Sequence, residues 1–269
     1  MMKIPHRLTA ILAATWLAAC GGGDPGGGFN PAAGAPALKD ATHVWAFGPT
    51  NVWVLDGSAT VHRFDGAAWS TLATPSMQGL GCIFALSATQ VWLCAGTQVL
   101  AYDGSAFTAS DVTTPTGLDG LTSLWASSPT DLWVTGSQAI VAHSSGGAWT
   151  RMLIGEPNNS SIWGSSPTDV YVLGTFDLYH YDGAAWTAVT LNGGAGDGQV
   201  WGTGSNDVWV MPGSSEISHY DGASWKPVQL ELVGELAAVW GPAPNDLWAA
   251  GSAGAIAHYD GASWTQLGH

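Results

Sequence analysis

Aromatic residues recur at three fixed slots in a unit of about 39 residues, and this repeat restricts the fold more than any other feature of the sequence. Successive first slots are 39, 41, 38, 38 and 39 residues apart. This period is typical of propeller blades and exceeds that of leucine-rich or ankyrin repeats. The first slots are Trp45, Phe84, Trp125, Trp163, Trp201 and Trp240; the second are Trp53, Trp92, Trp133, Tyr171, Trp209 and Trp248; the third are Trp69, Phe107, Trp149, Trp186, Trp225 and Trp264.

Each unit also has a pattern of short strands. Segments such as Asp207–Met211 and Ile217–Tyr220 are rich in β-branched and aromatic residues and are bounded by Gly, Pro, Asn or Asp. Asp-Gly pairs recur where a tight hairpin between the third and fourth strands needs a positive φ. They are Asp65-Gly66, Asp103-Gly104, Asp182-Gly183, Asp221-Gly222 and Asp260-Gly261. Four strands in each of six units predict an all-β chain, a six-bladed β-propeller of four-stranded blades.

The N-terminus predicts export. Lys3 and Arg7 precede an apolar run of 12 residues, Leu8–Ala19, which is too short to cross a bilayer and is typical of a signal peptide. The run ends in Leu-Ala-Ala-Cys20, which resembles a bacterial lipobox. That resemblance implies cleavage before Cys20, acylation of this cysteine, and a place at the outer membrane or cell surface. The alternative is an ordinary signal peptide followed by a stray cysteine.

The chain is therefore expected to have three segments. Residues 1–19 are the predicted signal peptide, and residues 40–269 are the predicted propeller. Residues 20–39 are a lipid-anchored, Gly/Pro-rich linker that cannot bury apolar surface and should act as a flexible tether.

The charge excludes some partners. The chain has 6 Lys and Arg against 20 Asp and Glu, a net charge of −14, and loss of the signal peptide would leave 4 basic residues and a charge of −16. So acidic a chain has no basic surface for phosphates, which argues against nucleic acid as a partner. It also argues against electrostatic binding to anionic membranes, so the lipid alone is expected to hold the protein there.

One stretch carries a resemblance to a known family. The phrase WGSSPTDVYVLG…HYDGAAWT, from Trp163 to Thr187, resembles the tryptophan-rich β-propeller repeats of bacterial secreted and lipid-anchored proteins, within the WD40/kelch-like propeller superfamily. The resemblance covers roughly residues 41–269. It implies a role in protein binding, glycan binding or scaffolding, with enzymes a minority, and it brings no catalytic motif that maps onto this chain.

The repeated tryptophans have two interpretations. They could form sugar-stacking platforms, or they could fill the space between blades. One aromatic at every equivalent slot is what packing requires, and we expect packing for the set as a whole. A lectin would need some of these rings exposed.

Two cysteines, Cys82 and Cys94, lie in the second unit. If the first two strands of this unit pair so that Phe84 faces Trp92, the two cysteines face each other, because 82 and 94 have the same sum as 84 and 92. An exported compartment permits oxidation, so we expect a structural disulfide. No CxxC or Cys-His spacing points to zinc or redox chemistry.

Known catalytic classes find little support. A sialidase-like propeller binds its substrate with three arginines, whereas the mature chain has only Arg63 and Arg151. No Gly-x-Ser-x-Gly elbow is present. Metal-dependent hydrolysis stays open, because hard cations need only converging carboxylates and carbonyls.

Acidic residues outside the repeat pattern form a candidate ligand-binding face. Some precede the innermost strands and others lie between second and third strands, two sets of loops that share one face of a propeller. Such a face could bind Ca²⁺ or a cationic partner, although surface loops of an acidic protein contain acids in any case. These residues are Asp40, Asp56, Asp119, Asp177, Asp197, Glu216 and Glu235.

Histidine and aspartate vary together among the units. In units three to six a histidine precedes the turn between the third and fourth strands, and an aspartate stands two residues before the second-slot aromatic. Units one and two lack both. A hairpin should place the partners opposite each other or nearly so, which predicts a structural hydrogen bond resembling the histidine-aspartate network of WD40 propellers, in preference to metal ligation. The pairs are Asp131 with His143, Asp169 with His180, Asp207 with His219, and Asp246 with His258.

Together these features favour a non-catalytic, monomeric, exported lipoprotein whose propeller binds or scaffolds at the cell envelope. Its partner would be an envelope or extracellular protein or a glycan. The alternative is a carbohydrate-active propeller, either a lectin or a metal-assisted glycan hydrolase, that uses the loop-rich face around the channel.

Overall fold

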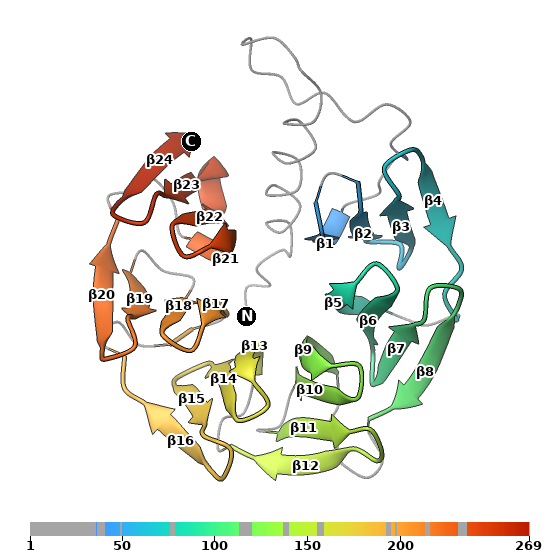
Figure 1. The fold of residues 1–269 in the computed structure, drawn as a ribbon, viewed down its shortest axis with the longest axis horizontal. Coiled ribbons are helices and arrows are strands. Elements are labelled where there is room, and N and C mark those ends of the chain that lie inside the picture. The colour runs from blue at the N-terminus through green and yellow to red at the C-terminus, as the bar shows by residue number, and fades with distance from the viewer. Residues whose placement is uncertain are drawn as a thin grey trace. The chain divides into compact units, whose positions relative to one another are not determined.

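Strands account for almost all the regular structure in the computed structural model of the chain (Figure 1). The structure describes residues 36, 41–48, 50–75, 79–112, 120–136, 140–154, 159–191, 195–196, 198–212, 216–230 and 236–268. The predicted signal peptide and all of the predicted linker except residue 36 lie outside these ranges. The chain divides into an N-terminal unit, residues 1–110, and a C-terminal unit, residues 111–269.

The N-terminal unit contains two four-stranded antiparallel sheets, blades 1 and 2. Blade 1 consists of β1 (Ala41–Ala46), β2 (Val52–Asp56), β3 (Val61–Phe64) and β4 (Trp69–Leu72). Blade 2 consists of β5 (Leu80–Ser87), β6 (Gln90–Ala95), β7 (Gln98–Tyr102) and β8 (Phe107–Asp111), whose last residue opens the next unit.

The C-terminal unit contains four more such sheets, blades 3 to 6. Blade 3 consists of β9 (Leu121–Ser128), β10 (Asp131–Gly136), β11 (Ile140–Ser145) and β12 (Thr150–Leu153). Blade 4 consists of β13 (Asn159–Ser166), β14 (Asp169–Gly174), β15 (Leu178–Tyr181) and β16 (Trp186–Val189). Blade 5 consists of β17 (Gln199–Gly204), β18 (Asp207–Met211), β19 (Glu216–Tyr220) and β20 (Trp225–Gln229). Blade 6 consists of β21 (Leu236–Ala243), β22 (Asp246–Gly251), the short 3-10 helix η1 (Ser252–Gly254), β23 (Ile256–Tyr259) and β24 (Trp264–Gly268).

Every sheet is built from four consecutive strands paired in chain order, so the fold is the predicted six-bladed β-propeller. In the C-terminal unit the first strands of successive blades lie side by side (Figure 1). The turns joining first to second and third to fourth strands lie at one end of each sheet, which we call the turn edge. The second-to-third connections lie at the opposite end, the loop edge. Among the described residues, no helix is long and apolar enough to cross a membrane.

The repeated aromatics pack between neighbouring blades. In the C-terminal unit the ring of Trp209, in the second strand of blade 5, lies 5.2 Å from the ring of Tyr259 and 5.6 Å from that of Trp264, both in blade 6. Trp133 meets Tyr181 and Trp186 of blade 4 in the same way. All eighteen slots fall within the described residues, and every one is buried or half-buried. This burial supports packing as the role of the aromatic set.

The glycine that follows the first-slot tryptophan in blades 4 and 5 receives a ring from the preceding blade. A Cβ at Gly164 would lie 2.9 Å from Cη2 of Trp125, and one at Gly202 would lie 2.7 Å from Cη2 of Trp163. Real Cβ atoms essentially never come this close, so only glycine lets the ring settle against the strand without displacing it. The backbone carbonyl oxygens of Asp169 and Asp207, in the same blades, would lie 2.9 and 2.5 Å from these two Cβ positions, so the Trp-Gly pair reflects crowding within the hairpin as well as contact between blades.

The predicted disulfide between Cys82 and Cys94 is confirmed. The two residues are direct cross-strand partners in β5 and β6, and Phe84 faces Trp92 in the same ladder. The bridge therefore joins the first two strands of blade 2.

Candidate functional site

Each of the four predicted Asp-His pairs is within hydrogen-bonding distance in the structure. The distances from the histidine Nε2 to the aspartate Oδ1 are 2.5 Å for His143 and Asp131, 2.6 Å for His180 and Asp169, 2.7 Å for His219 and Asp207, and 2.9 Å for His258 and Asp246. All four lie toward the turn edge of their blades, because each aspartate begins a second strand and each histidine stands near the end of a third.

The partners are nearly opposite each other, one of the two arrangements expected from the sequence, and not directly opposite. Each histidine faces the second-slot aromatic, as His219 faces Trp209, and the aspartate lies two residues earlier on the second strand. The contact is therefore diagonal across the hairpin, which long side chains can span. Facing the aromatic lets the imidazole stack on it: the ring centroids of His219 and Trp209 are 3.8 Å apart with an interplanar angle of 14°.

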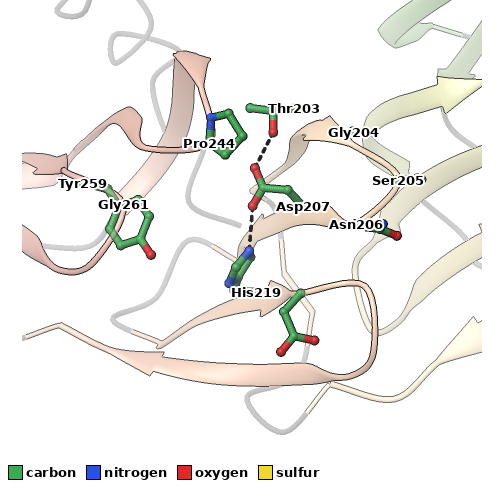
Figure 2. A pocket seen from close by; sticks show the side chains of 10 residues that line it. Thr203, Gly204, Ser205, Asn206, Asp207, His219, Pro244, Tyr259 and Gly261 are labelled. Atoms are coloured by element: carbon green, nitrogen blue, oxygen red, sulfur yellow. Dashed lines mark hydrogen bonds and ion pairs between the residues drawn. The ribbon is translucent and has the colours of Figure 1, made fainter.

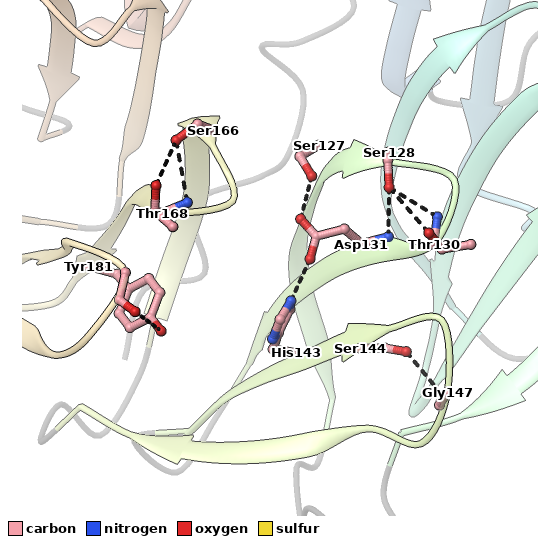
Figure 3. Close-up of polar contacts among 11 residues, drawn as sticks. Ser127, Ser128, Thr130, Asp131, His143, Ser144, Gly147, Ser166, Thr168 and Tyr181 are labelled. Carbon is pink, nitrogen blue, oxygen red and sulfur yellow. Dashed lines mark hydrogen bonds and ion pairs between the residues drawn. The ribbon is translucent and has the colours of Figure 1, made fainter.

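A hydroxyl adds a third member to the pairs of blades 3, 4 and 5. Ser127, Ser165 and Thr203 each donate to the Oδ2 atom of the aspartate in their blade. Figure 3 shows the two hydrogen bonds that link Ser127 to Asp131 and Asp131 to His143. The hydroxyl stands two residues after the first-slot aromatic, and blade 6 has Pro242 there. The sequence contained this signal, but the interpretation followed only aspartate and histidine.

The order of these groups does not suit nucleophilic catalysis. A serine nucleophile needs the imidazole next to its hydroxyl so that the ring can take the proton. Here the aspartate stands between hydroxyl and imidazole and accepts from both. Burial by itself would raise the pKa of Asp207, but hydrogen bonds from its donors, His219 first, outweigh burial and lower that pKa. The pKa of Asp169 is lowered for the same reasons. The arrangement holds an ionised carboxylate in place.

The N-terminal unit has different chemistry at the same positions. In blade 1, Trp53 donates its indole N–H to Asn51 over 3.1 Å, and the Arg63 guanidinium carbon lies 5.3 Å from the centre of the Trp53 ring. An arginine stacked on the tryptophan thus takes the place of the histidine. The hydroxyl positions hold the exposed side chains of Phe47 and Leu86.

Blade 1 also contains a buried carboxylate-imidazole contact that the sequence interpretation missed. Asp56 and His62 are each only 6% exposed, and their Oδ2 and Nε2 atoms lie 3.3 Å apart. Oδ1 of Asp56 accepts from the backbone N–H groups of Ser58 and Thr60 and from the Ser58 hydroxyl. Burial opposes ionisation, but these bonds together outweigh it and lower the pKa of Asp56 to about 2. Asp56, a candidate for the acidic ligand face, is therefore occupied by its own loop.

We expect Asp56 to add acid-sensitive stability. Its pKa falls from 3.8 to about 2 on folding, which corresponds to about 2 kcal/mol of stabilisation at neutral pH. Because the folded-state pKa is the lower one, this contribution is complete above pH 4 and disappears as the pH falls to about 2. Urea unfolding of Asp56→Asn and wild type should differ by this amount at pH 6 and converge toward pH 2. Asp177→Asn, at an exposed position on the same connection in blade 4, is the control; a gap that does not change with pH would contradict the assignment.

The rest of the predicted acidic face is only partly visible. Asp177 is exposed beside a small cavity of about 50 Å³ at the loop edge of blade 4. Glu216 begins β19, and its side chain is not described. Asp40, Asp119, Asp197 and Glu235 lie outside the described residues. Within the ranges that the structure covers, no group of three or more His, Cys, Asp or Glu side chains is placed to hold a metal ion.

A hollow in the C-terminal unit lies at the turn edge between blades 5 and 6, and we call it the blade 5–6 hollow. Its volume is about 560 Å³. Figure 2 shows Asp207 within it, bonded to Thr203 on one side and to His219 on the other. Its lining consists of Thr203, Gly204, Ser205, Asn206, Asp207, His219, Asp221, Pro244, Tyr259 and Gly261. This site belongs to the turn edge, whereas the sequence had pointed to the loop edge.

The Asp207–His219 contact should stabilise the fold more than its counterpart in blade 6. The Asp207 side chain is 16% exposed and also accepts from Thr203, whereas Asp246 is 46% exposed and has no hydroxyl partner among the described residues. Double-mutant cycles of Asp→Asn with His→Ala, measured by urea unfolding at pH 7, should give coupling of about 1–2 kcal/mol for Asp207 with His219. For Asp246 with His258 we expect less than about 1 kcal/mol. Additive losses at Asp207 and His219 would refute the contact.

Comparison with known proteins identifies the fold. No protein-family model and no curated protein matches the chain. Among solved structures, YCF48 bound to D1 peptide is 14% identical, with 87% of this chain and 82% of that one covered and a TM-score of 0.61. The YCF48 structure from Cyanidioschyzon merolae gives a TM-score of 0.64 at 14% identity, covering 82% of each chain.

Two further likenesses come from other proteins. BBS1N in complex with ARL6DN is 16% identical, covers 89% of this chain and 83% of its own, and has a TM-score of 0.64. The extracellular domain of the putative hybrid two-component system BT3049 from B. thetaiotaomicron is 10% identical, with a TM-score of 0.70. This chain matches 35% of that domain with 86% of its own length. At such identities the likeness shows the β-propeller fold alone.

Proposed function

We propose that this protein is a non-catalytic, exported lipoprotein whose propeller binds a protein or peptide partner at the cell envelope. The observation that carries the proposal is the blade 5–6 hollow, a recess of about 560 Å³ that combines a few polar groups with apolar surface. The Asp207–His219 contact in this hollow fixes the positions of the two side chains and does not activate a nucleophile. Recesses of this size with a few well-placed polar groups are typical of binding sites.

A polypeptide partner agrees better with the structure than a glycan. Sugar-binding sites commonly use the face of an exposed aromatic ring, and none of the eighteen repeated aromatics is exposed. Solved propellers of similar fold include one with a bound D1 peptide and one in complex with ARL6DN. Among the repeated aromatics, the lectin alternative therefore lacks the exposed rings that would have favoured it.

Capture from cell envelopes tests the binding function. The full chain, immobilised in mild detergent, should retain one or a few specific proteins after chemical cross-linking, and heat-unfolded chain should not. Protease treatment of the envelopes beforehand should abolish the capture, and periodate oxidation of glycans should leave it intact. Capture that survives protease and is lost after periodate would support the carbohydrate alternative.

Export and anchoring form a separate part of the proposal. The Leu-Ala-Ala-Cys20 sequence after a basic and apolar start supports acylation, and the Cys82–Cys94 disulfide agrees with an oxidising compartment. The variant Cys20→Ser should move the protein from the membrane fraction to the soluble fraction. Mass spectrometry of the wild-type N-terminal peptide should show an acylated cysteine as its first residue. An unmodified peptide that continues through Cys20 would contradict the anchor.

A further inference from the structure

We propose that the blade 5–6 hollow binds a basic side chain, lysine or arginine, of a partner polypeptide. This inference rests on the proposed binding function and specifies the chemistry of its site. Four observations support it: the shape of the hollow, a hydroxyl left without its usual partner, the orientation of an imidazole, and the charge of the lining.

The hollow has walls from two blades of the C-terminal unit. Blade 5 supplies Thr203, Asp207 and His219, and blade 6 supplies Pro244 and Tyr259 (Figure 2). The proline and the tyrosine ring offer apolar surface beside the polar groups. A long side chain that ends in a charge matches this combination, because its aliphatic stem can contact apolar surface while its head meets polar groups.

Tyr259 departs from the repeat. In blades 2, 4 and 5 the equivalent tyrosine donates its hydroxyl to the carbonyl of the following turn glycine, as Tyr220 does to Gly222 over 3.1 Å. The Tyr259 hydroxyl makes no hydrogen bond within the part of the chain that the structure describes. Its ring is held against Trp209 and Trp264, yet its polar end is left for a ligand in the hollow.

His219 presents an acceptor. Its Nε2 atom bonds to Asp207, so in the neutral ring the proton is on Nε2 and the lone pair is on Nδ1. Figure 2 shows this second nitrogen on the side of the ring away from Asp207. Stacking on Trp209 at 3.8 Å fixes the plane of the ring. His219, which lines the hollow, therefore carries an acceptor with a set direction.

The charge of the lining selects a cation. Two carboxylates, Asp207 and Asp221, line the hollow, and no lysine or arginine does. Lys226 bonds to Asp221, but its side chain is 62% exposed, so a cation from a partner can compete for that carboxylate at little cost. With a chain charge of −14 behind it, the site favours an ammonium or guanidinium group and disfavours phosphate, sulfate or carboxylate.

Short peptides provide the test. The full chain is titrated with acetyl-Gly-Lys-Gly-amide, with its arginine counterpart, and with the norleucine peptide, which keeps the aliphatic stem and lacks the charge. Binding is followed by nitrogen chemical shifts of the histidine rings. We expect millimolar affinity for at least one basic peptide, a shift at His219 but not at His180, and at least tenfold weaker binding of the norleucine peptide.

Variants locate the site. Asp221→Asn combined with Tyr259→Phe should weaken binding of the basic peptide at least tenfold. The same changes at the preceding junction, Asp182→Asn with Tyr220→Phe, should leave it unchanged. Three outcomes would overturn the proposal. The norleucine peptide could bind as well as the basic peptides, or both double variants could lose binding equally. The third outcome is that neither basic peptide binds at a concentration 20 times the expected millimolar dissociation constant.

The two proposals can fail separately. If envelope capture succeeds and Asp221→Asn with Tyr259→Phe captures the same protein equally well, the basic side chain is wrong and the binding function stands. If the peptides bind as expected and no envelope protein is captured, the chemistry of the hollow stands and the proposed function is wrong.

Discussion

Replacing Trp209 by alanine is expected to cost about 3–5 kcal/mol of unfolding free energy, the usual range for truncating a fully buried tryptophan. Trp209 is 1% exposed and contacts His219, Tyr259 and Trp264, so its loss opens a cavity between blades 5 and 6. Urea unfolding followed by circular dichroism measures the effect. A loss below about 1 kcal/mol would mean that the blades are not held together by these rings.

Phenylalanine substitutions separate packing from hydrogen bonding. The indole N–H of Trp209 donates to Asp207 over 2.9 Å, whereas that of Trp133, equally buried in blade 3, has no acceptor among the described residues. Both changes remove similar apolar area, but only Trp209→Phe also removes a hydrogen bond. It should therefore cost about 1 kcal/mol more than Trp133→Phe. Equal costs would show that the bond to Asp207 contributes nothing.

Loss of the Cys82–Cys94 bridge is the second large expected effect. The bridge joins residues 12 apart, and a loop of this size implies about 2–3 kcal/mol under the chain-entropy model. The double variant Cys82→Ala with Cys94→Ala should lose this amount. Reductant should destabilise wild type to the same extent and leave the double variant unchanged. Alkylation of both thiols in the exported protein without reductant would contradict the bridge.

The fold could be predicted from the sequence because its signals are local and repeated. The three aromatic slots set the number of blades, and the Asp-Gly turns set the hairpins within them. The same regularity gave the disulfide, since the pairing of Phe84 with Trp92 fixes the register of Cys82. The slots are packing positions, and because each has the same packing role in every blade, an aromatic residue recurs there in all six units.

The candidate site was less predictable, because it depends on departures from the repeat. The pattern of Asp207 with His219 was visible, but the diagonal register was not, since loop lengths alone do not set it. At Asp56, the backbone N–H groups of Ser58 and Thr60 bind the carboxylate, which the sequence did not reveal, and the rest of the acidic face stays a prediction. The hollow depends on how two sheets approach each other, and no residue pattern along one chain encodes that distance.

The contact between Trp125 and Gly164, repeated between Trp163 and Gly202, runs in one direction along the chain. Each glycine receives the ring of the blade before it, and a carbonyl oxygen of its own blade leaves no room for a larger residue. Units 1 to 3 have alanine at this position, namely Ala46, Ala85 and Ala126. A gene duplication or an engineered exchange that puts one of these units in the place of unit 4 or 5 would therefore set a Cβ atom where the ring lies, whereas an exchange between units 4 and 5 would keep the contact.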